Sequence, residues 1–160
     1  MSLVKNSYNV IGLMSGTSLD GLDIAYCSFF KNNGNWNFKL IDYTTVDYDS
    51  NLYSHLNNAQ SYSGLDLSLL NIELGNFIGT VCDEFIRDKK ISVDFIASHG
   101  HTIFHQPEKR LTLQIGSGAV ICSKTNTPTV SDFRVMDVAY RGQGAPLVPV
   151  GDKLLFSDYD

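Results

Sequence analysis

Residues Gly16–Asp23 read GTSLDGLD, a loop of small and polar side chains directly after an apolar run. Successive backbone N–H groups in such a loop can surround a phosphate, and glycine permits positive φ and close approach. The hydroxyls of Thr17 and Ser18 would add donors. Asp20 or Asp23 would hold Mg²⁺, directly or through water, because that ion prefers oxygen ligands. The pattern is neither a Walker sequence nor G-x-G-x-x-G. The alternative interpretation is an ordinary hairpin turn.

A second polar stretch, SHGHTIFHQP, carries His99, His101 and His105 at spacings of two and four. Residues i and i+2 share a face of a strand, so two of these imidazoles could converge on zinc. No carboxylate lies close by in the sequence to complete such a site. The alternative is a turn at a strand end whose histidines bond the backbone or a substrate.

The third stretch, SDFRVMDVAYRGQGAP, combines Asp132 and Asp137 with Arg134 and Arg141. Asp132 follows a predicted strand, and open α/β sheets place ligand-contacting groups at the carboxyl ends of their strands. The arginines could pair with these carboxylates or with an anionic substrate. The loop Gly142–Pro146 suits the lining of a pocket. A structural Asp–Arg pair beside a loop is the alternative interpretation.

The elements that must position these residues follow from the apolar periodicity. Three consecutive strands are predicted to form an antiparallel meander, at residues 8–14, 23–30 and 36–46. Helical spacing follows over residues 66–90, with Ser63 or Asp66 as its cap. The later elements are strands at 93–97, 110–115 and 128–133, and a helix at 116–126. The fold class is therefore α/β.

The composition excludes several classes of protein. The 160 residues carry a net charge of −5, which argues against a nucleic-acid groove. Three cysteines without a C-x-x-C pattern favour reduced thiols in a cytosol over a disulfide framework. No run approaches the ~20 apolar residues of a membrane span, and the first residues lack the core of a signal peptide.

Four motifs in this order resemble the anhydro-N-acetylmuramic acid kinase family: IGLMSGTSLDGLDIA, ASHGHTIFHQP, TLQIGSG and DFRVMDVAYRGQGAPLVP. They span residues 11–149, and together they are highly specific. The family belongs to the superfamily of sugar kinases, Hsp70 chaperones and actin. The resemblance implies a ribonuclease-H-like (actin-like ATPase) domain, with a mixed sheet and helices on both faces. Residues 1–160 would be the amino-terminal domain of a two-domain kinase, alone of low or no activity, whose second domain is absent from this chain.

The resemblance also implies the reaction. Water opens the anhydro bridge of 1,6-anhydro-N-acetylmuramic acid, and the released O6 takes the γ-phosphoryl group of ATP with Mg²⁺ as cofactor. Such a protein is cytoplasmic and recycles cell-wall sugar. Its partners are ATP and a small amino sugar, with neither nucleic acid nor membrane, and the full-length protein would form a homodimer.

Site residues follow from the same resemblance. The general base is Asp132, with Asp137 as the second candidate. The substrate side has His99, Gln143 and Gly144, and the turn Gly116–Gly118 contacts substrate or phosphate. The phosphate cradle, with Thr17 and Asp20 nearest the γ-phosphate and Asp20 as the Mg²⁺ ligand, comprises Gly16, Thr17, Ser18, Leu19, Asp20, Gly21, Leu22 and Asp23. His101 and Arg141 depart from the family's usual Gln and Gly.

Two other hypotheses stay open at this point. One is a non-catalytic nucleotide-binding module of the same superfamily. The other is a zinc-dependent or serine hydrolase built on Ser18, His99 and His101, which bound zinc in metal analysis would support.

Overall fold

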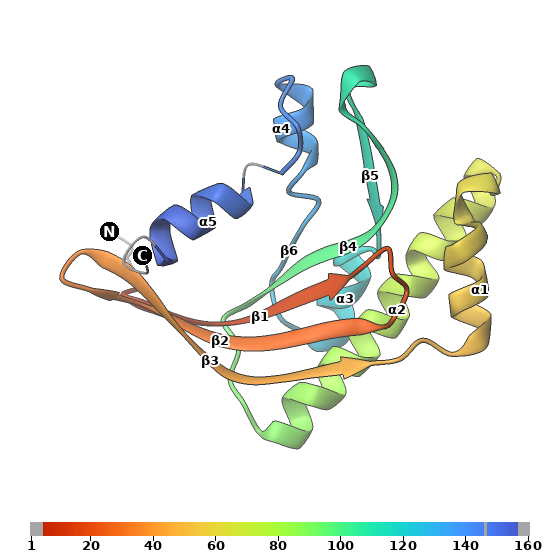
Figure 1. The fold of residues 1–160 in the computed structure, drawn as a ribbon. Coiled ribbons are helices and arrows are strands. Elements are labelled where there is room, and N and C mark those ends of the chain that lie inside the picture. The colour runs from red at the N-terminus through yellow and green to blue at the C-terminus, as the bar shows by residue number, and fades with distance from the viewer. Residues whose placement is uncertain (1–4, 146, 157–160) are drawn as a thin grey trace.

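The computed structural model describes residues 5–145 and 147–156. A mixed sheet of six strands forms its centre, in the order β3-β2-β1-β4-β5, with β6 also paired to β4 (Figure 1). The strands are β1 Ser7–Ser15, β2 Leu22–Asn32, β3 Asn35–Val46, β4 Phe95–Gln106, β5 Leu111–Ile115 and β6 Thr129–Ser131. The helices are α1 Ser50–Asn58, α2 Gly64–Lys89, α3 Gly118–Thr125, α4 Val135–Ala139 and α5 Leu147–Leu155, with short 3-10 turns at Ala59–Ser61 and Pro107–Lys109.

The opening meander is confirmed. β1 pairs antiparallel with β2, with Ser15 opposite Leu22, and β2 pairs antiparallel with β3. The turn between β2 and β3 is the tight one expected from NNGN, with positive φ at Asn33 (49°) and Gly34 (86°). The connection between β1 and β2 is wider, and it leaves the six residues Gly16–Gly21 outside the strands.

β4 is longer than the sequence predicts. The predicted strand at 93–97 and the histidine-bearing turn after it are one strand, Phe95–Gln106, because the second half of β4 pairs antiparallel with β5. The first half runs parallel to β1 and β6. The register shifts where Gly100 adopts φ 70°, and a Cβ on this glycine would lie 2.3 Å from the carbonyl oxygen of Ile115. A local pattern cannot show this irregularity, since it depends on two partner strands.

The long predicted helix is confirmed as α2. Ser63 caps its start by accepting the N–H of Asp66 at 3.1 Å, and Lys90 closes its end in the left-handed conformation. Gly75 and Gly79 allow the close packing expected of them, because a Cβ on either would lie 3.0 Å from atoms of Ser117 or Lys124. The short helices α1, α4 and α5 were not predicted. No helix in the described part of the chain has the length and apolar character to cross a membrane.

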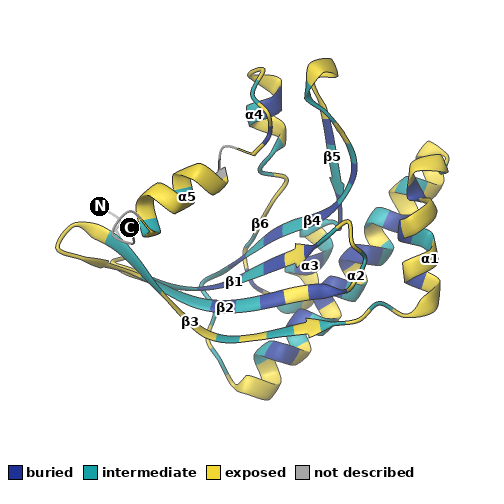
Figure 2. Cartoon of the chain, viewed as in Figure 1, coloured by how far each residue is buried: buried dark blue, intermediate teal, exposed yellow. Residues whose placement is uncertain are grey.

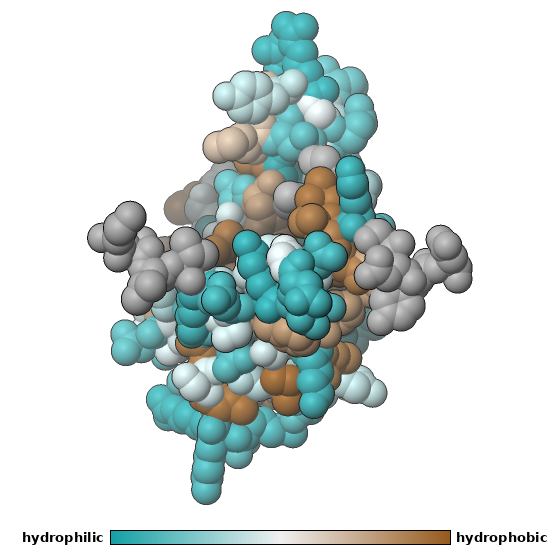
Figure 3. Space-filling view, turned by 90° about the vertical axis from the view of Figure 1, so that its left-hand side faces the viewer, coloured by the Kyte–Doolittle hydropathy of each residue, from teal (hydrophilic) through white to brown (hydrophobic). Residues whose placement is uncertain are grey.

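The two faces of the sheet are covered to different extents. Helices α1, α2 and α3 lie on one face, where Ile11, Ile78 and Ile96 are fully buried (Figure 2). Helix α5 lies over the other face, so helices on both faces are confirmed (Figure 1). A largely apolar cavity of about 650 Å³ remains between α5 and that face, lined by residues that include Phe29 and Phe95. Figure 3 views the end of the molecule with the β2–β3 turn, where hydrophobic surface lies among hydrophilic side chains.

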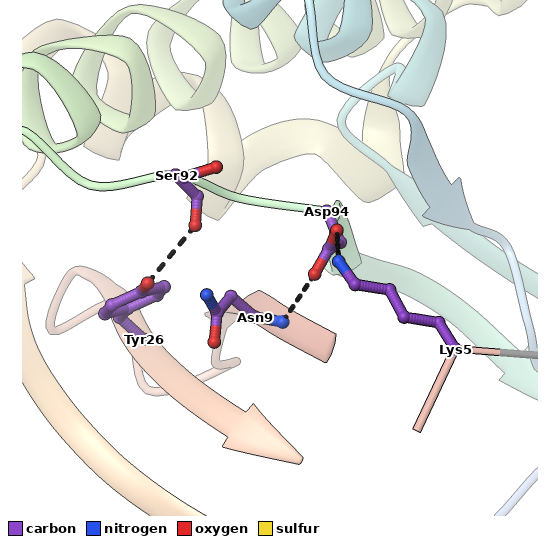
Figure 4. A network of polar contacts seen from close by, with 5 residues as sticks. All are labelled: Lys5, Asn9, Tyr26, Ser92 and Asp94. Carbon is purple, nitrogen blue, oxygen red and sulfur yellow. Dashed lines mark hydrogen bonds and ion pairs between the residues drawn. The ribbon is translucent and has the colours of Figure 1, made fainter. Parts of the chain in front are cut away.

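A polar network joins neighbouring segments of the sheet near the start of β4 (Figure 4). The carboxylate of Asp94 accepts the backbone N–H of Asn9 at 2.8 Å and pairs with the ammonium of Lys5. These hydrogen bonds, that of Lys5 first, lower the pKa of Asp94. The hydroxyl of Tyr26 donates to the carbonyl of Ser92 at 3.2 Å. The network ties β1 and β2 to the segment that enters β4, at the end of the sheet opposite the glycine-rich loop.

Candidate functional site

Three parallel strands bring the chemistry-bearing stretches to one edge of the sheet. β1 and β6 both run parallel to β4, so their carboxyl ends meet at the same edge. The loop Gly16–Gly21 follows β1, the irregular centre of β4 carries His99 and His101, and Asp132 follows β6. Because β4 lies between β1 and β6, the loop and Asp132 are separated by two strand spacings, roughly 10 Å. That gap suits a small ligand held between them.

The loop after β1 presents polar groups to solvent. Thr17, Ser18 and Asp20 are exposed. The hydroxyl of Ser18 donates to the carboxylate of Asp20 at 2.7 Å, and the N–H of Leu19 donates to the carbonyl of Gly16 at 3.2 Å. Leu19 has positive φ (59°), an unusual conformation for a non-glycine residue. The first half of the predicted phosphate cradle therefore presents its hydroxyls to solvent, where a ligand can reach them.

In the second half of the cradle, residues 21–23, contacts within the fold account for the residue types. Gly21 has φ 141°, and a Cβ there would lie 2.8 Å from the carbonyl oxygen of Val46, so β3 requires this glycine. Leu22 is fully buried in the core, so only its backbone is available to a ligand. Asp23 accepts the hydroxyl of Thr45 at 2.6 Å. Positive φ occurs in this loop at Leu19 and Gly21, and not at Gly16.

A buried hydrogen-bond chain lies directly below the loop. The hydroxyl of Tyr48 donates to Ser15 Oγ at 2.6 Å, and Ser15 Oγ lies 3.0 Å from His101 Nδ1. Ser15 and His101 are 1% and 4% exposed. Burial, followed by the nearby His99, lowers the pKa of His101. His101 is therefore neutral, and its Nδ1 accepts a hydrogen bond from the Ser15 hydroxyl. These hydrogen bonds hold the last residue of β1 against β4.

His99 has fixed partners on both ring nitrogens. Its Nδ1 lies 2.9 Å from the carbonyl of Gly100 and donates to it, and its Nε2 accepts the Nε–H of Arg134 at 2.9 Å. Burial is the largest cause of its lowered pKa, and the positive charge of Arg134 adds to it. A neutral imidazole next to a guanidinium thus lines the pocket beside Asp132.

Asp132, the predicted base, combines an unusual backbone conformation with a partly desolvated carboxylate. It adopts φ 59°, an uncommon conformation of the kind that often occurs at functional sites. The surrounding protein partly desolvates its carboxylate and raises the pKa, although the residue as a whole is exposed. Asp132 and His99 line a pocket of about 170 Å³ together with the turn Gly116–Gly118. The structure thus brings together the predicted base, one predicted substrate contact and the glycine-rich turn.

Asp137, Gln143 and Gly144 occupy a different place. The carboxylate of Asp137 accepts the N–H of Gly144 at 2.7 Å and is packed against Gly142. Gly144 is buried with φ 74°, and a Cβ there would lie 2.9 Å from Val138. Gln143 lines a separate pocket with Arg110 and residues near it. Asp137 therefore holds the neighbouring loop Gly142–Pro146 in its conformation. Pro146, the last residue of that loop, lies outside the described residues.

The clustered histidines and the acidic side chains are the groups that could hold a metal ion. His105 Nδ1 lies 3.2 Å from Thr112 Oγ1, so each of the three clustered histidines has its own separate partner. Within residues 5–145 and 147–156, no group of three or more His, Cys, Asp or Glu side chains is placed to hold a metal ion. The zinc hypothesis therefore gains no support. An Mg²⁺ at Asp20 would need further ligands from its nucleotide.

Among the residues of the Asp132 pocket that the sequence analysis missed are Asn71, Ser98 and Gln114. Asn71 accepts the N–H of Gly116 at 2.8 Å through its side chain and that of Ser117 at 3.1 Å through its carbonyl. A signal for Ser98 was present. It occupies an inward position of β4, two residues after the buried Ile96, where an apolar side chain is the norm.

Fold and site together define a class: an α/β domain of the ribonuclease-H-like, actin-like ATPase type, with its site at the carboxyl edge of a mixed sheet. The chain belongs to the anhydro-N-acetylmuramic acid kinase family, whose model matches residues 8–160. Anhydro-N-acetylmuramic acid kinases of Bacillus cereus (strain Q1) and Bacillus thuringiensis subsp. konkukian (strain 97-27) are each 40% identical to it over 160 residues. These matches cover 93% of this chain and 42% of each relative, so the chain spans less than half the length of these relatives.

Proposed function

We propose that this chain supplies the loop and the base of an ATP-dependent kinase that opens 1,6-anhydro-N-acetylmuramic acid and phosphorylates its O6. One observation carries the proposal. The exposed loop Gly16–Asp20 and the carboxylate of Asp132 flank β4 at the same edge of the sheet, in a chain of this kinase family. The spacing leaves room for a sugar with a terminal phosphate beside it.

Asp132 acts as the general base in this proposal. Its raised pKa makes the ionised carboxylate a stronger proton acceptor than an ordinary aspartate while it stays ionised at neutral pH. Asp132 takes a proton from water as the water oxygen bonds to C1 and the C1–O6 bond breaks. The freed O6 then attacks the γ-phosphorus of ATP, and ADP leaves. Asp137 is the weaker candidate, because its carboxylate is held by Gly144 N–H.

The loop Gly16–Asp20 binds the transferring phosphoryl group through its amides and the Thr17 hydroxyl. Mg²⁺ bound with the nucleotide would neutralise charge on that group. Asp20 is exposed and offers one carboxylate, which fits an ion that keeps waters and phosphate oxygens as its other ligands. The hydrogen bond from Ser18 orients this carboxylate in the free loop. His99 contacts the sugar from the β4 side of the pocket.

Residues 1–160 form the amino-terminal domain of a two-domain kinase in this proposal, and a second domain supplies the adenine pocket. The protein acts in the cytoplasm, where its three free cysteines remain reduced. It pairs as a homodimer through parts of the longer protein. The chain alone then binds nucleotide weakly and has little or no turnover.

A chimaera tests the proposal. Residues 8–160 of this chain replace the matching segment of the Bacillus cereus relative, and ATP-dependent phosphorylation of 1,6-anhydro-N-acetylmuramic acid is measured. We expect activity in the chimaera, a loss of roughly 10³-fold or more with Asp132→Asn, and a smaller loss with Asp137→Asn. Wild-type rates in Asp132→Asn would remove Asp132 as the base. A folded chimaera that binds nucleotide without phosphorylating the sugar would favour the non-catalytic module.

A further inference from the structure

We propose that Tyr48 and His101 are positioning residues for the phosphate loop Gly16–Asp20. Both act through the hydroxyl of Ser15, the last residue of β1, and so fix the path by which the backbone leaves the sheet and enters the loop. The inference rests on the proposed function for the role of the loop, and it adds the side chains that hold the loop in place. Neither residue contacts the nucleotide itself.

The loop makes few hydrogen bonds to the rest of the fold. Residues 17–20 hydrogen-bond only within the loop in the described part of the chain, while the side chain of Leu19 packs against the hydrophobic core. The pairing of β1 with β4 becomes irregular between Leu13 and Ser15, just before the loop begins. The side-chain hydrogen bonds of Ser15 therefore set the point from which the loop starts.

The three side chains have fixed donor and acceptor roles. Tyr48 donates to Ser15 Oγ at 2.6 Å, so Ser15 turns its own hydrogen toward His101 Nδ1, 3.0 Å away. Each hydrogen bond supports the other, because a buried polar group whose bond is not made is costly. The ring of Tyr48 packs against Phe77 on α2, with ring centroids 5.4 Å apart. The start of the loop is thereby linked to the closed side of the sheet.

The surroundings of Tyr48 keep it a donor. Burial is the main cause that raises the pKa of this phenol, the hydrogen bond with Ser15 opposes the rise, and the carboxylates of Asp20 and Asp23 add to it. Tyr48 therefore retains its proton at neutral pH. A phosphate bound at the loop would act in the same direction as the two carboxylates, because a negative charge disfavours the phenolate.

Protonation of His101 would disrupt this arrangement. Ser15 on β1 and Ile115 on β5 are its uncharged neighbours, and His99 on its own strand is the neighbour that can carry a charge. An imidazolium donates from both ring nitrogens, so Ser15 Oγ would face donors from Tyr48 and His101 and have no acceptor for its own hydrogen. The loop thus has this support while His101 is neutral, and it loses the support as the pH falls through the folded pKa of His101.

The chimaera described above tests the positioning role. Tyr48→Phe removes the donor but keeps the ring against α2, and kcat/KM for ATP should fall by about 10-fold or more, because a displaced loop aligns the γ-phosphoryl group poorly. The KM for the sugar should change little, since the loop does not bind it. Tyr43→Phe, at an exposed tyrosine on β3, is the matched control and should have the wild-type constants.

The pH profile separates positioning from a purely structural role. His101→Gln keeps an acceptor for Ser15 but does not become charged, so its kcat/KM for ATP should match wild type near about pH 7.5 and fall less steeply toward about pH 5. Tyr48→Phe should cause little further loss in a Ser15→Ala background, because both act through one hydroxyl. A purely structural role would lower the melting temperature of Tyr48→Phe and leave the kinetic constants and the pH profile unchanged.

The outcomes distinguish this inference from the proposed function. If the chimaera phosphorylates the sugar, and Tyr48→Phe and His101→Gln both keep the wild-type kcat/KM and pH profile, the positioning role is wrong and the proposed function stands.

If the folded chimaera is inactive, the proposed function fails, and the 160-residue chain decides on the positioning role. Magnesium tripolyphosphate should then shift the amide NMR signals of Gly16–Asp20, with lower affinity in Tyr48→Phe than in wild type. An absence of such shifts, or equal affinity in the two proteins, would overturn the inference as well.

Discussion

The two faces of the central sheet are both apolar, but only one is fully packed. On the α2 face, Ile11, Leu74 and Ile78 have no exposed surface. On the α5 face, Met14 is 42% exposed and Tyr43 is 71% exposed, and a cavity of about 650 Å³ separates part of the sheet from α5. The same strands therefore contribute to a closed core on one side and to an open surface on the other.

This difference shows which contacts stabilise the site. The glycine-rich loop is attached to the closed side through Ser15 and His101, and the turn before α3 is attached to α2 through Asn71. Neither attachment involves α5. The site edge is therefore expected to keep its geometry when the open face changes, and the stability of the domain should depend mainly on the α2 face.

The largest expected effect is on the closed face. Leu74→Ala should lower the free energy of unfolding by about 2–5 kcal/mol, because the buried side chain leaves a cavity that the packed helices cannot fill. Urea denaturation followed by circular dichroism measures it. Leu69→Ala on the exposed side of the same helix is the control, with a change near 0.5 kcal/mol or less.

A smaller loss is expected on the open face. Phe29→Ala should cost about 1–2 kcal/mol, below the ~3–5 kcal/mol of a buried phenylalanine, because Phe29 already lines a cavity and is only partly buried. The same denaturation experiment applies. A loss as large as that of Leu74→Ala would show that the α5 face contributes equally and would remove the contrast.

The third prediction concerns the polar chain on the closed face. The folded pKa of His101 lies below its unfolded value near 6.5, so its stabilising contribution is present above that pH and is lost as the pH falls through the folded pKa. His101→Gln, which keeps an acceptor for Ser15, should therefore lose less stability than wild type between pH 7.5 and 5. The variant should still lose some stability as the pH falls, since the pKa of His99 is also lowered. An equal fall in melting temperature for the two proteins across this range would contradict the assignment.

The smallest effect is expected at Asp132. Its folded pKa lies above the unfolded value of 3.8, so ionisation opposes folding. The destabilisation develops as the pH rises above the unfolded pKa and is complete once the pH exceeds the folded pKa. Asp132→Asn should raise the melting temperature slightly at pH 7 and lose this advantage below about pH 4. Differential scanning calorimetry at both pH values measures it. A lower melting temperature at pH 7 would mean that the carboxylate has a structural partner.

Local patterns predicted the elements that depend on local contacts. The three opening strands and α2 follow from alternation and helical spacing, and Asp132 was expected at the end of its strand. The length of β4 was missed because the residues after Ala97 become strand only by pairing with β5. The short helices α1, α4 and α5 were missed, and the five residues of α4 are too few for a clear helical period. Ser98 and Gln114 were missed because their exceptional feature, a buried oxygen without a partner, exists only in three dimensions.

The sequence by itself determined the α/β class, the family and the stretches that carry the chemistry, because the types and order of residues are enough for these. Only the tertiary structure decided which of them share a site. It placed Asp132 and His99 in one pocket with the turn Gly116–Gly118, turned Asp137 toward Gly144, and left Leu22 in the core. The physical reason is that sheet pairing and helix packing set distances between residues far apart in the chain, and those distances determine which groups can act together.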